Sequence, residues 1–167
     1  MSERMILSSD LSMKIDKIID QLRQKTHPIC IVLADISGQL LSTYNANKEI
    51  DVTGLAALFA SNMGATGAIA EKIYETSGFD SIMQEGKDSN VFLSKIKNSY
   101  LLAIVFSSSH QIGMVRLFTK KACNELLELT QEYEVQNQTT MKKVVGNNLS
   151  GKLSQQLTNV FENSGII

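Results

Sequence analysis

The feature that most constrains the fold of this chain is a long predicted helix, Asp51 to Thr76, in which small residues recur at every fourth position. Rows of small side chains let a second backbone approach a helix closely. The two rows comprise Ala56, Ala60, Gly64 and Ala68, and beside them Ala57, Ser61 and Ala65. Gly64 and Gly67 each cost about 1 kcal/mol relative to alanine inside a helix, which usually indicates a packing reason. We therefore predict that this helix packs tightly, either on a second copy of the chain or on the chain's own sheet.

Composition limits the class of protein. The chain has 167 residues, of which 43% are hydrophobic, as is typical of one globular domain with an appendage. Its net charge of -1 argues against a general nucleic-acid-binding protein, which normally carries a basic stripe. Tryptophan is absent and aromatic residues are few, so a base-stacking platform is not expected either. We predict that the chain binds no nucleic acid.

The cysteines and the first residues indicate a compartment. Cys30 and Cys123 are not in a CxxC motif, so neither a zinc site nor a thioredoxin-type site is expected. Met1 to Asp10 is polar and has no apolar core of a secretory signal. We also find no apolar run that approaches the length of a membrane span. The expectation is a cytoplasmic protein with free thiols, no metal, no cofactor and no stable membrane insertion.

The hydrophobic pattern predicts the other elements. Helical spacing of apolar residues from Asp10 onward predicts an amphipathic helix that ends at His27-Pro28. Strands are predicted over residues 29–34, 39–44, 79–85, 90–96 and 100–106, and a third helix over 110–133. Short connections such as Asp35 to Gly38 make the sheet mainly antiparallel, with the most apolar strand, 100–106, at its centre. We predict an α/β fold, an α/β/α sandwich with a five-stranded mainly antiparallel sheet.

The pattern also predicts the contacts of two helices. The small-residue helix should be capped by Asp51 or Thr53. Its larger apolar contacts should come from Leu55, Leu58, Phe59, Ile69 and Ile73. The third helix should bury Val115, Phe118, Ala122, Leu126, Leu129 and Tyr133.

The end of the chain forms a separate part in this interpretation. After a polar break, a short amphipathic helix is predicted from Ser150 to Asn163. Its apolar face comprises Leu153, Leu157, Val160 and Phe161. This face could fold back on the domain or dock on a partner, with Lys142 and Lys143 attracting an acidic surface. The predicted organisation is an N-terminal segment 1–9, a domain 10–135 and an extension 136–167.

The ordered set of segments resembles the Roadblock/LC7 family. The matching segments are Ile29 to Gly38, the Ala/Gly-rich helix, Asn90 to Leu93, Tyr100 to Val105, and Ile112 to Arg116. The resemblance implies a five-stranded antiparallel sheet with helices on both sides, and dimerisation through the second helix and its neighbouring strand. It also implies a platform for small Ras-like GTPases or for motor and signalling complexes. Bacterial MglB-like members act as GTPase-activating proteins, whereas other members are scaffolds.

Given this resemblance, we predict a homodimer whose interface comprises Ala56, Ala57, Ala60, Ser61, Gly64, Ala65, Gly67 and Ala68.

Residues with catalytic potential are sparse. His27 and His110 stand at helix boundaries with no nucleophile nearby in sequence, and the glycines of the second helix lack the Lys-Ser/Thr of a phosphate loop. Arg4, Arg23 and Arg116 are the candidates for an arginine inserted into a partner's phosphate site, but Arg116 is embedded in a helix. We therefore expect no enzyme. Any activation of a GTPase would order the partner's own switch residues.

Two main functions stay open at this point. The first is a dimeric regulator or scaffold that binds a small Ras-like GTPase and stimulates its hydrolysis of GTP. The alternative is a non-catalytic structural subunit of a larger Roadblock/longin-type assembly. A small-ligand sensory module is disfavoured, because no convergent set of polar residues lies on the strands.

Overall fold

The computed structural model describes residues 9–74 and 78–132. The chain divides into two compact units, Met1–Leu129 and Thr130–Ile167, and the first contains every described strand. The predicted tail helix, with Leu153, Leu157, Val160 and Phe161, lies outside the described residues, as do Arg4, Lys142 and Lys143.

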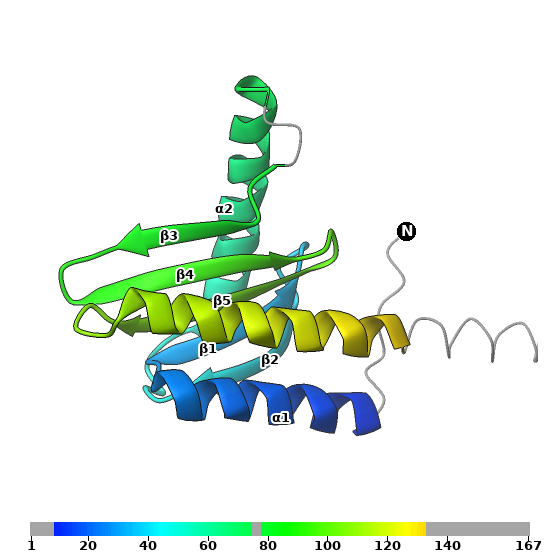
Figure 1. Ribbon diagram of the computed structural model, residues 1–167, viewed down its shortest axis with the longest axis vertical. Helices are drawn as coiled ribbons and strands as arrows, with labels where there is room; N and C mark the ends of the chain where they lie inside the picture. Colours follow the sequence, from blue (N-terminus) through cyan, green and yellow to red (C-terminus); the bar gives the residue numbers. More distant parts are fainter. Residues whose placement is uncertain (1–8, 75–77, 133–167) are drawn as a thin grey trace, which may run out of the picture. The chain divides into compact units, whose positions relative to one another are not determined.

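Seven elements with defined ends precede a last described helix (Figure 1). They are α1 (Ser9–Thr26), β1 (Cys30–Asp35), β2 (Leu40–Asn45), α2 (Val52–Lys72), β3 (Ser81–Glu85), β4 (Ser89–Ile96) and β5 (Tyr100–Ser107). The last helix is described over residues 112–132, and we call it the 112–132 helix. This order agrees with the order predicted from the hydrophobic pattern.

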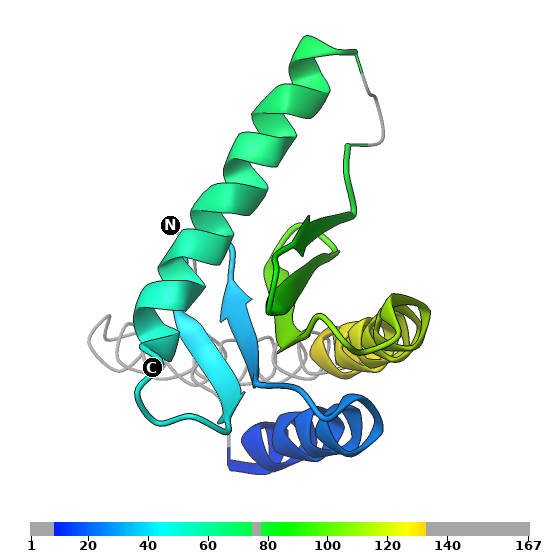
Figure 2. The same cartoon turned by 90° about the vertical axis from the view of Figure 1, so that its left-hand side faces the viewer.

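The five strands form one antiparallel sheet in the order β2-β1-β5-β4-β3. The most apolar strand, β5, is central as predicted, and Val32 of β1 pairs with Thr43 of β2 and Ala103 of β5. Helix α2 covers one face of the sheet, and α1 and the 112–132 helix cover the other (Figure 2). The predicted α/β/α sandwich is confirmed.

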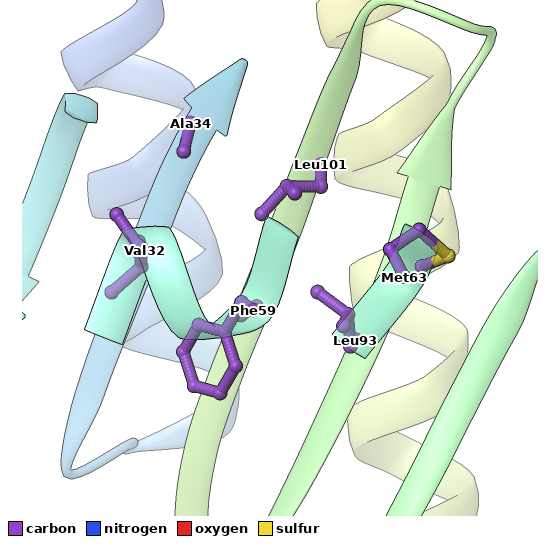
Figure 3. Packing of buried hydrophobic residues seen from close by; sticks show 8 residues of the cluster. Val32, Ala34, Phe59, Met63, Leu93 and Leu101 are labelled. Atoms are coloured by element: carbon purple, nitrogen blue, oxygen red, sulfur yellow. The ribbon is translucent and has the colours of Figure 1, made fainter. Parts of the chain in front are cut away.

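Strand alternation explains why both faces of the sheet are apolar. Successive side chains point to opposite faces, so a central strand that is covered on both sides must be apolar throughout. In β1 every residue from Cys30 to Ala34 is buried. On the α2 side, Phe59 and Met63 of the helix pack over the sheet (Figure 3). The strand residues of this cluster are Val32, Ala34, Leu93, Leu101 and Ala103.

The beginning of α2 is fixed by its cap and by a turn. The side chain of Asp51 accepts a hydrogen bond from the Gly54 amide at 2.9 Å, which confirms the first of the two predicted caps. The β1–β2 turn lies against the helix, because a Cβ atom added at Gly38 would lie 2.8 Å from the Cα of Ala57. Gly38 also has a φ of +89°, a conformation that favours glycine. The turn therefore sets where the first half of α2 rests.

Three predicted contacts of α2 are wrong. Leu58, Ile69 and Ile73 are 65%, 56% and 60% exposed, although the sequence pattern predicted that they supply larger apolar contacts of this helix. The helix is apolar around much of its circumference, so its pattern does not define which side meets the sheet. The 112–132 helix shows a smaller departure, because Phe118 is only half-buried while its neighbour Thr119 is fully buried.

Helix α2 also corrects the expectation that no apolar run reaches the length of a membrane span. By length and composition alone it is long and apolar enough, because it has 21 residues and an 18-residue window with a mean hydropathy of 1.3. One such helix is weak evidence of a membrane span; a mostly buried core helix passes the same test, whereas 17% of the apolar window of α2 is buried. In α2 the apolar residues include Phe59 and Met63, which pack on the sheet.

Candidate functional site

The first predicted row of small residues does not stay on one face of α2. Ala56 is fully buried in the chain's own core, Ala60 is half-buried, and Gly64 and Ala68 are exposed. A helix turns by about 100° per residue, so each step of four residues rotates the row by about 40°. Ala56 therefore offers no surface to a second copy, which corrects its place in the predicted interface.

The second row lies on the outer side of α2. Ala57, Ser61 and Ala65 are all exposed, and Gly67 is exposed farther along the helix. The Ser61 hydroxyl donates to the Ala57 carbonyl at 2.9 Å, so its polarity is satisfied within the helix. The outcome is a narrow surface of small side chains, bordered by the exposed Leu58 and Ile69. We call this surface, from Ala57 to Ala68, the outer face of α2.

The glycines of this outer face have no explanation within the described chain. A Cβ atom added at Gly64 or at Gly67 would meet nothing within 4 Å. Close packing on the chain's own sheet, the simpler of the two interpretations of the pattern, therefore does not account for either glycine. An interface with a second copy stays a prediction, and these two positions are where it can be tested.

Large apolar side chains are exposed beyond this face, at the end of α2. Ile73 is 60% exposed and Tyr74 is 90% exposed, and Phe79, which precedes β3, is also exposed. Isolated exposed apolar residues are normal, but several near one another mark an interaction surface. Ile73 and Tyr74 are adjacent in sequence, so apolar side chains are exposed together just after the last residue of α2.

The arginines of the described chain contact its own aromatic rings. The guanidinium of Arg116 lies over the ring of Phe92, 5.7 Å from its centroid. Arg23 lies 5.4 Å from the centroid of Tyr44 and donates to the Asp20 carboxylate at 2.7 Å. This hydrogen bond lowers the pKa of Asp20 and favours its charged form. Both contacts support structural roles for these two arginines.

The cysteines are poor nucleophiles. Both thiols are free and buried, and burial raises the pKa of each to about 11. A hydrogen bond with Ser94 opposes this shift at Cys123 without cancelling it. A reactive thiolate requires a lowered pKa and access to solvent. In the part of the chain that the structure describes, no three His, Cys, Asp or Glu side chains are placed to hold a metal ion.

A groove on the other face of the sheet was not anticipated from the sequence. It has a volume of about 360 Å³ and lies between α1 and the 112–132 helix. Its lining comprises Ile18, Gln21, Leu22, Gln24, Lys25, Phe118, Lys121, Ala122 and Glu125. The sequence did contain one indication of this groove. Met114, Leu117 and Phe118 make the apolar surface of the third helix wider than the single stripe that packs on the sheet.

Comparison with known proteins gives consistent results. The family description of the Roadblock/LC7 domain matches residues 14–106. The structure of Myxococcus xanthus MglB is similar at 30% sequence identity and a TM-score of 0.69, over 79% of this chain and 94% of that one. A gliding protein MglB from Thermus thermophilus has 23% identity and a TM-score of 0.72, over 79% and 99% of the two chains.

A further solved structure, described as MglB with a tetrameric arrangement, has 24% identity and a TM-score of 0.73, over 79% of this chain and 98% of that one. Among curated proteins there is no match.

Proposed function

Because the chain belongs to the Roadblock/LC7 family, we propose that it acts as a homodimeric regulator or scaffold that binds a small Ras-like GTPase. The similarity to MglB from Myxococcus xanthus supports this proposal, together with the GTPase-directed role that the sequence resemblance implies. A cytoplasmic location is part of the proposal and is compatible with two free, buried thiols.

The outer face of α2 is the observation that carries the proposal. It combines small exposed side chains with two glycines that nothing in the described chain explains. Close approach of another backbone would account for both glycines. The exposed Leu58 and Ile69, which lie along the same edge of this face about three helical turns apart, would then supply apolar contact area beside the small residues. One related structure is described as tetrameric, which is compatible with self-association.

In this proposal the chain is not itself an enzyme. Arg23 and Arg116 are engaged with Tyr44 and Phe92, and neither is free to enter a partner's phosphate site without losing that contact. Stimulation of GTP hydrolysis would therefore come from ordering the partner's own switch residues. Such an activator works by position and contributes no side chain to the phosphate.

Light scattering after size exclusion tests the association. The purified chain is measured alone and with a candidate Ras-like GTPase, loaded either with GDP or with a GTP analogue. We expect a dimer that binds the GTP-analogue form preferentially. A monomer, or a dimer that binds both nucleotide forms of the GTPase equally or binds neither, would contradict the proposal and favour the structural-subunit alternative.

Multiple-turnover hydrolysis of GTP tests the regulation. The GTPase is assayed with the wild-type chain, with Ala65→Arg on the outer face of α2, and with Met13→Arg on α1 as a matched control. Met13 is 64% exposed and belongs to a helix on the opposite face of the sheet, so its variant should fold and behave like the wild type. We expect acceleration that Ala65→Arg abolishes. Equal rates with and without the chain would leave only the scaffold role.

A further inference from the structure

The groove between α1 and the 112–132 helix has the form of a site for a third helix. Leu22 and Ala122 are buried at its base, and Ile18 and Phe118 form its half-buried sides. Two neighbouring helices leave such a groove when no third element fills it, and helices pack at interaxial distances of about 8–10 Å.

An exposed apolar run extends the groove along the 112–132 helix. Met114 is 48% exposed and Leu117 is 63% exposed, and each precedes a lining residue, Phe118 or Lys121, by one helical turn. Residues at this spacing share one side of a helix. From Met114 to Glu125 the surface is about 16 Å long, which corresponds to three turns of a bound helix.

The charges at the groove favour one kind of occupant. Lys25 stands on the α1 side and Lys121 on the opposite side. Glu125 is the only carboxylate in the lining, and it lies 3.9 Å from Lys121, which satisfies part of that charge. The remaining lining groups, Gln21 and Gln24, are neutral, and Gln24 donates to the Asp20 carboxylate at 2.6 Å, whose charge Arg23 balances at 2.7 Å. A helix with carboxylates on both sides of its apolar stripe would thus meet a cation on each side.

We propose that this groove binds an amphipathic helix of a partner protein, with acidic residues flanking the apolar stripe. The site is independent of the proposed function, because it lies on the face of the sheet opposite to α2 (Figure 2). A second copy fits less well, since a two-fold contact between identical grooves would bring lysines against lysines. The chain's own segment 150–163 also fits less well, because it carries a single carboxylate, Glu162, and one lysine, Lys152.

Two synthetic peptides test the proposal. Both are helical peptides with leucines at positions i, i+3, i+4 and i+7, flanked by glutamates in one and by lysines in the other. Fluorescence anisotropy with the full-length chain should show that the glutamate peptide binds at least about tenfold more tightly at low salt. Absence of binding, or equal binding of the two peptides, would overturn the proposal.

Matched variants locate the binding. The double change Lys25→Glu and Lys121→Glu should reverse the preference between the peptides, whereas Lys120→Glu, an exposed position outside the lining, should not. Leu117→Glu should weaken the binding of the glutamate peptide by about tenfold or more. Met13→Glu should leave the affinity for this peptide unchanged. Circular dichroism confirms that each variant is folded. If the double variant still prefers the glutamate peptide, the peptide binds elsewhere on the chain and the proposal is overturned.

A last variant addresses the chain's own tail. Leu157→Asp together with Phe161→Asp, in the full-length chain, removes the apolar face of the predicted tail helix. Unchanged binding of the glutamate peptide supports a partner as the occupant. Binding that appears only in this variant would show that the tail is the occupant, and would overturn the proposal.

Discussion

Alanine at both glycines of the outer face should have opposite effects on the single chain and on the dimer. A Cβ atom at Gly64 or Gly67 has no described neighbour within 4 Å, so the methyl groups of Gly64→Ala and Gly67→Ala meet open space in the single chain. Glycine in a helix interior is about 0.8–1.0 kcal/mol less favourable than alanine. The double variant should therefore raise the free energy of unfolding of the isolated chain by about 2 kcal/mol.

The dimer should respond in the opposite direction if a second copy packs on this face. Extra methyl groups in a close contact typically cost about 1–3 kcal/mol, and a two-fold interface contains each position twice. A loss of about 2 kcal/mol corresponds to a dissociation constant about 30-fold higher. The same substitutions thus stabilise the single chain and weaken its association.

Two measurements separate these effects. Urea unfolding at concentrations low enough to populate the single chain gives its free energy of unfolding, and analytical ultracentrifugation gives the dissociation constant of the dimer. Gly113→Ala is the control, because a Cβ atom at this exposed position of the 112–132 helix also meets nothing within 4 Å. It should leave association unchanged. An unaltered dimer in the Gly64→Ala, Gly67→Ala variant would refute the proposed interface.

Three other changes have expected outcomes that follow from the core. Gly38→Ala should lower the free energy of unfolding by about 3 kcal/mol in urea titrations, because it combines a positive φ with a methyl group 2.8 Å from the Cα of Ala57. Thr119→Val should raise it by about 1 kcal/mol, since the buried Thr119 hydroxyl has no hydrogen-bond partner among the described residues. The free energy of unfolding should fall as the pH rises above about 8.5, the pKa of a cysteine thiol in the unfolded chain. The reason is that burial raises the pKa of Cys30 and Cys123 to about 11 in the folded chain, so only the unfolded chain loses these protons between the two values. The expected slope is up to about 1.4 kcal/mol per pH unit for each cysteine.

Each of these predictions has an outcome that would contradict it. Wild-type stability in Gly38→Ala would mean that the turn and α2 separate easily. Loss of stability in Thr119→Val would mean that its hydroxyl has a partner. The pH effect requires comparison with a Cys30→Ala, Cys123→Ala variant, which should lose the extra slope; an identical slope would assign it to other groups.

The local pattern was sufficient to predict much of the fold. The Asp35 to Gly38 turn, the Asp51 cap and the central position of β5 each depend on residues close in sequence or on a continuous apolar run. In the turn, one oxygen of Asp35 accepts from the Ser37 amide and hydroxyl and from the Gln39 amide, at 2.9, 2.6 and 2.9 Å. Hydrogen bonds between residues this close in sequence can be predicted without knowledge of the tertiary structure.

The candidate site was less predictable, because it depends on which side of α2 meets the sheet. Ala56 and Gly64 share a row in the sequence, yet one is in the core and the other is exposed. The pattern cannot separate them when small and large apolar residues surround the helix. The groove was missed for a related reason: it requires two helices far apart in sequence, and neither Ile18 nor Phe118 indicates the other.

The contact between Gly38 and Ala57 restricts how α2 can move. Because the turn backbone lies against the helix at this point, with no room for a Cβ atom, α2 cannot move closer to the β1–β2 turn without a steric clash. Farther along α2, Phe59, Met63 and Ala70 are buried, and Phe59 and Met63 pack on the sheet. The absence of a side chain at Gly38 therefore determines how closely the turn and α2 approach, and with it where the outer face of α2 lies relative to the β1–β2 edge of the sheet.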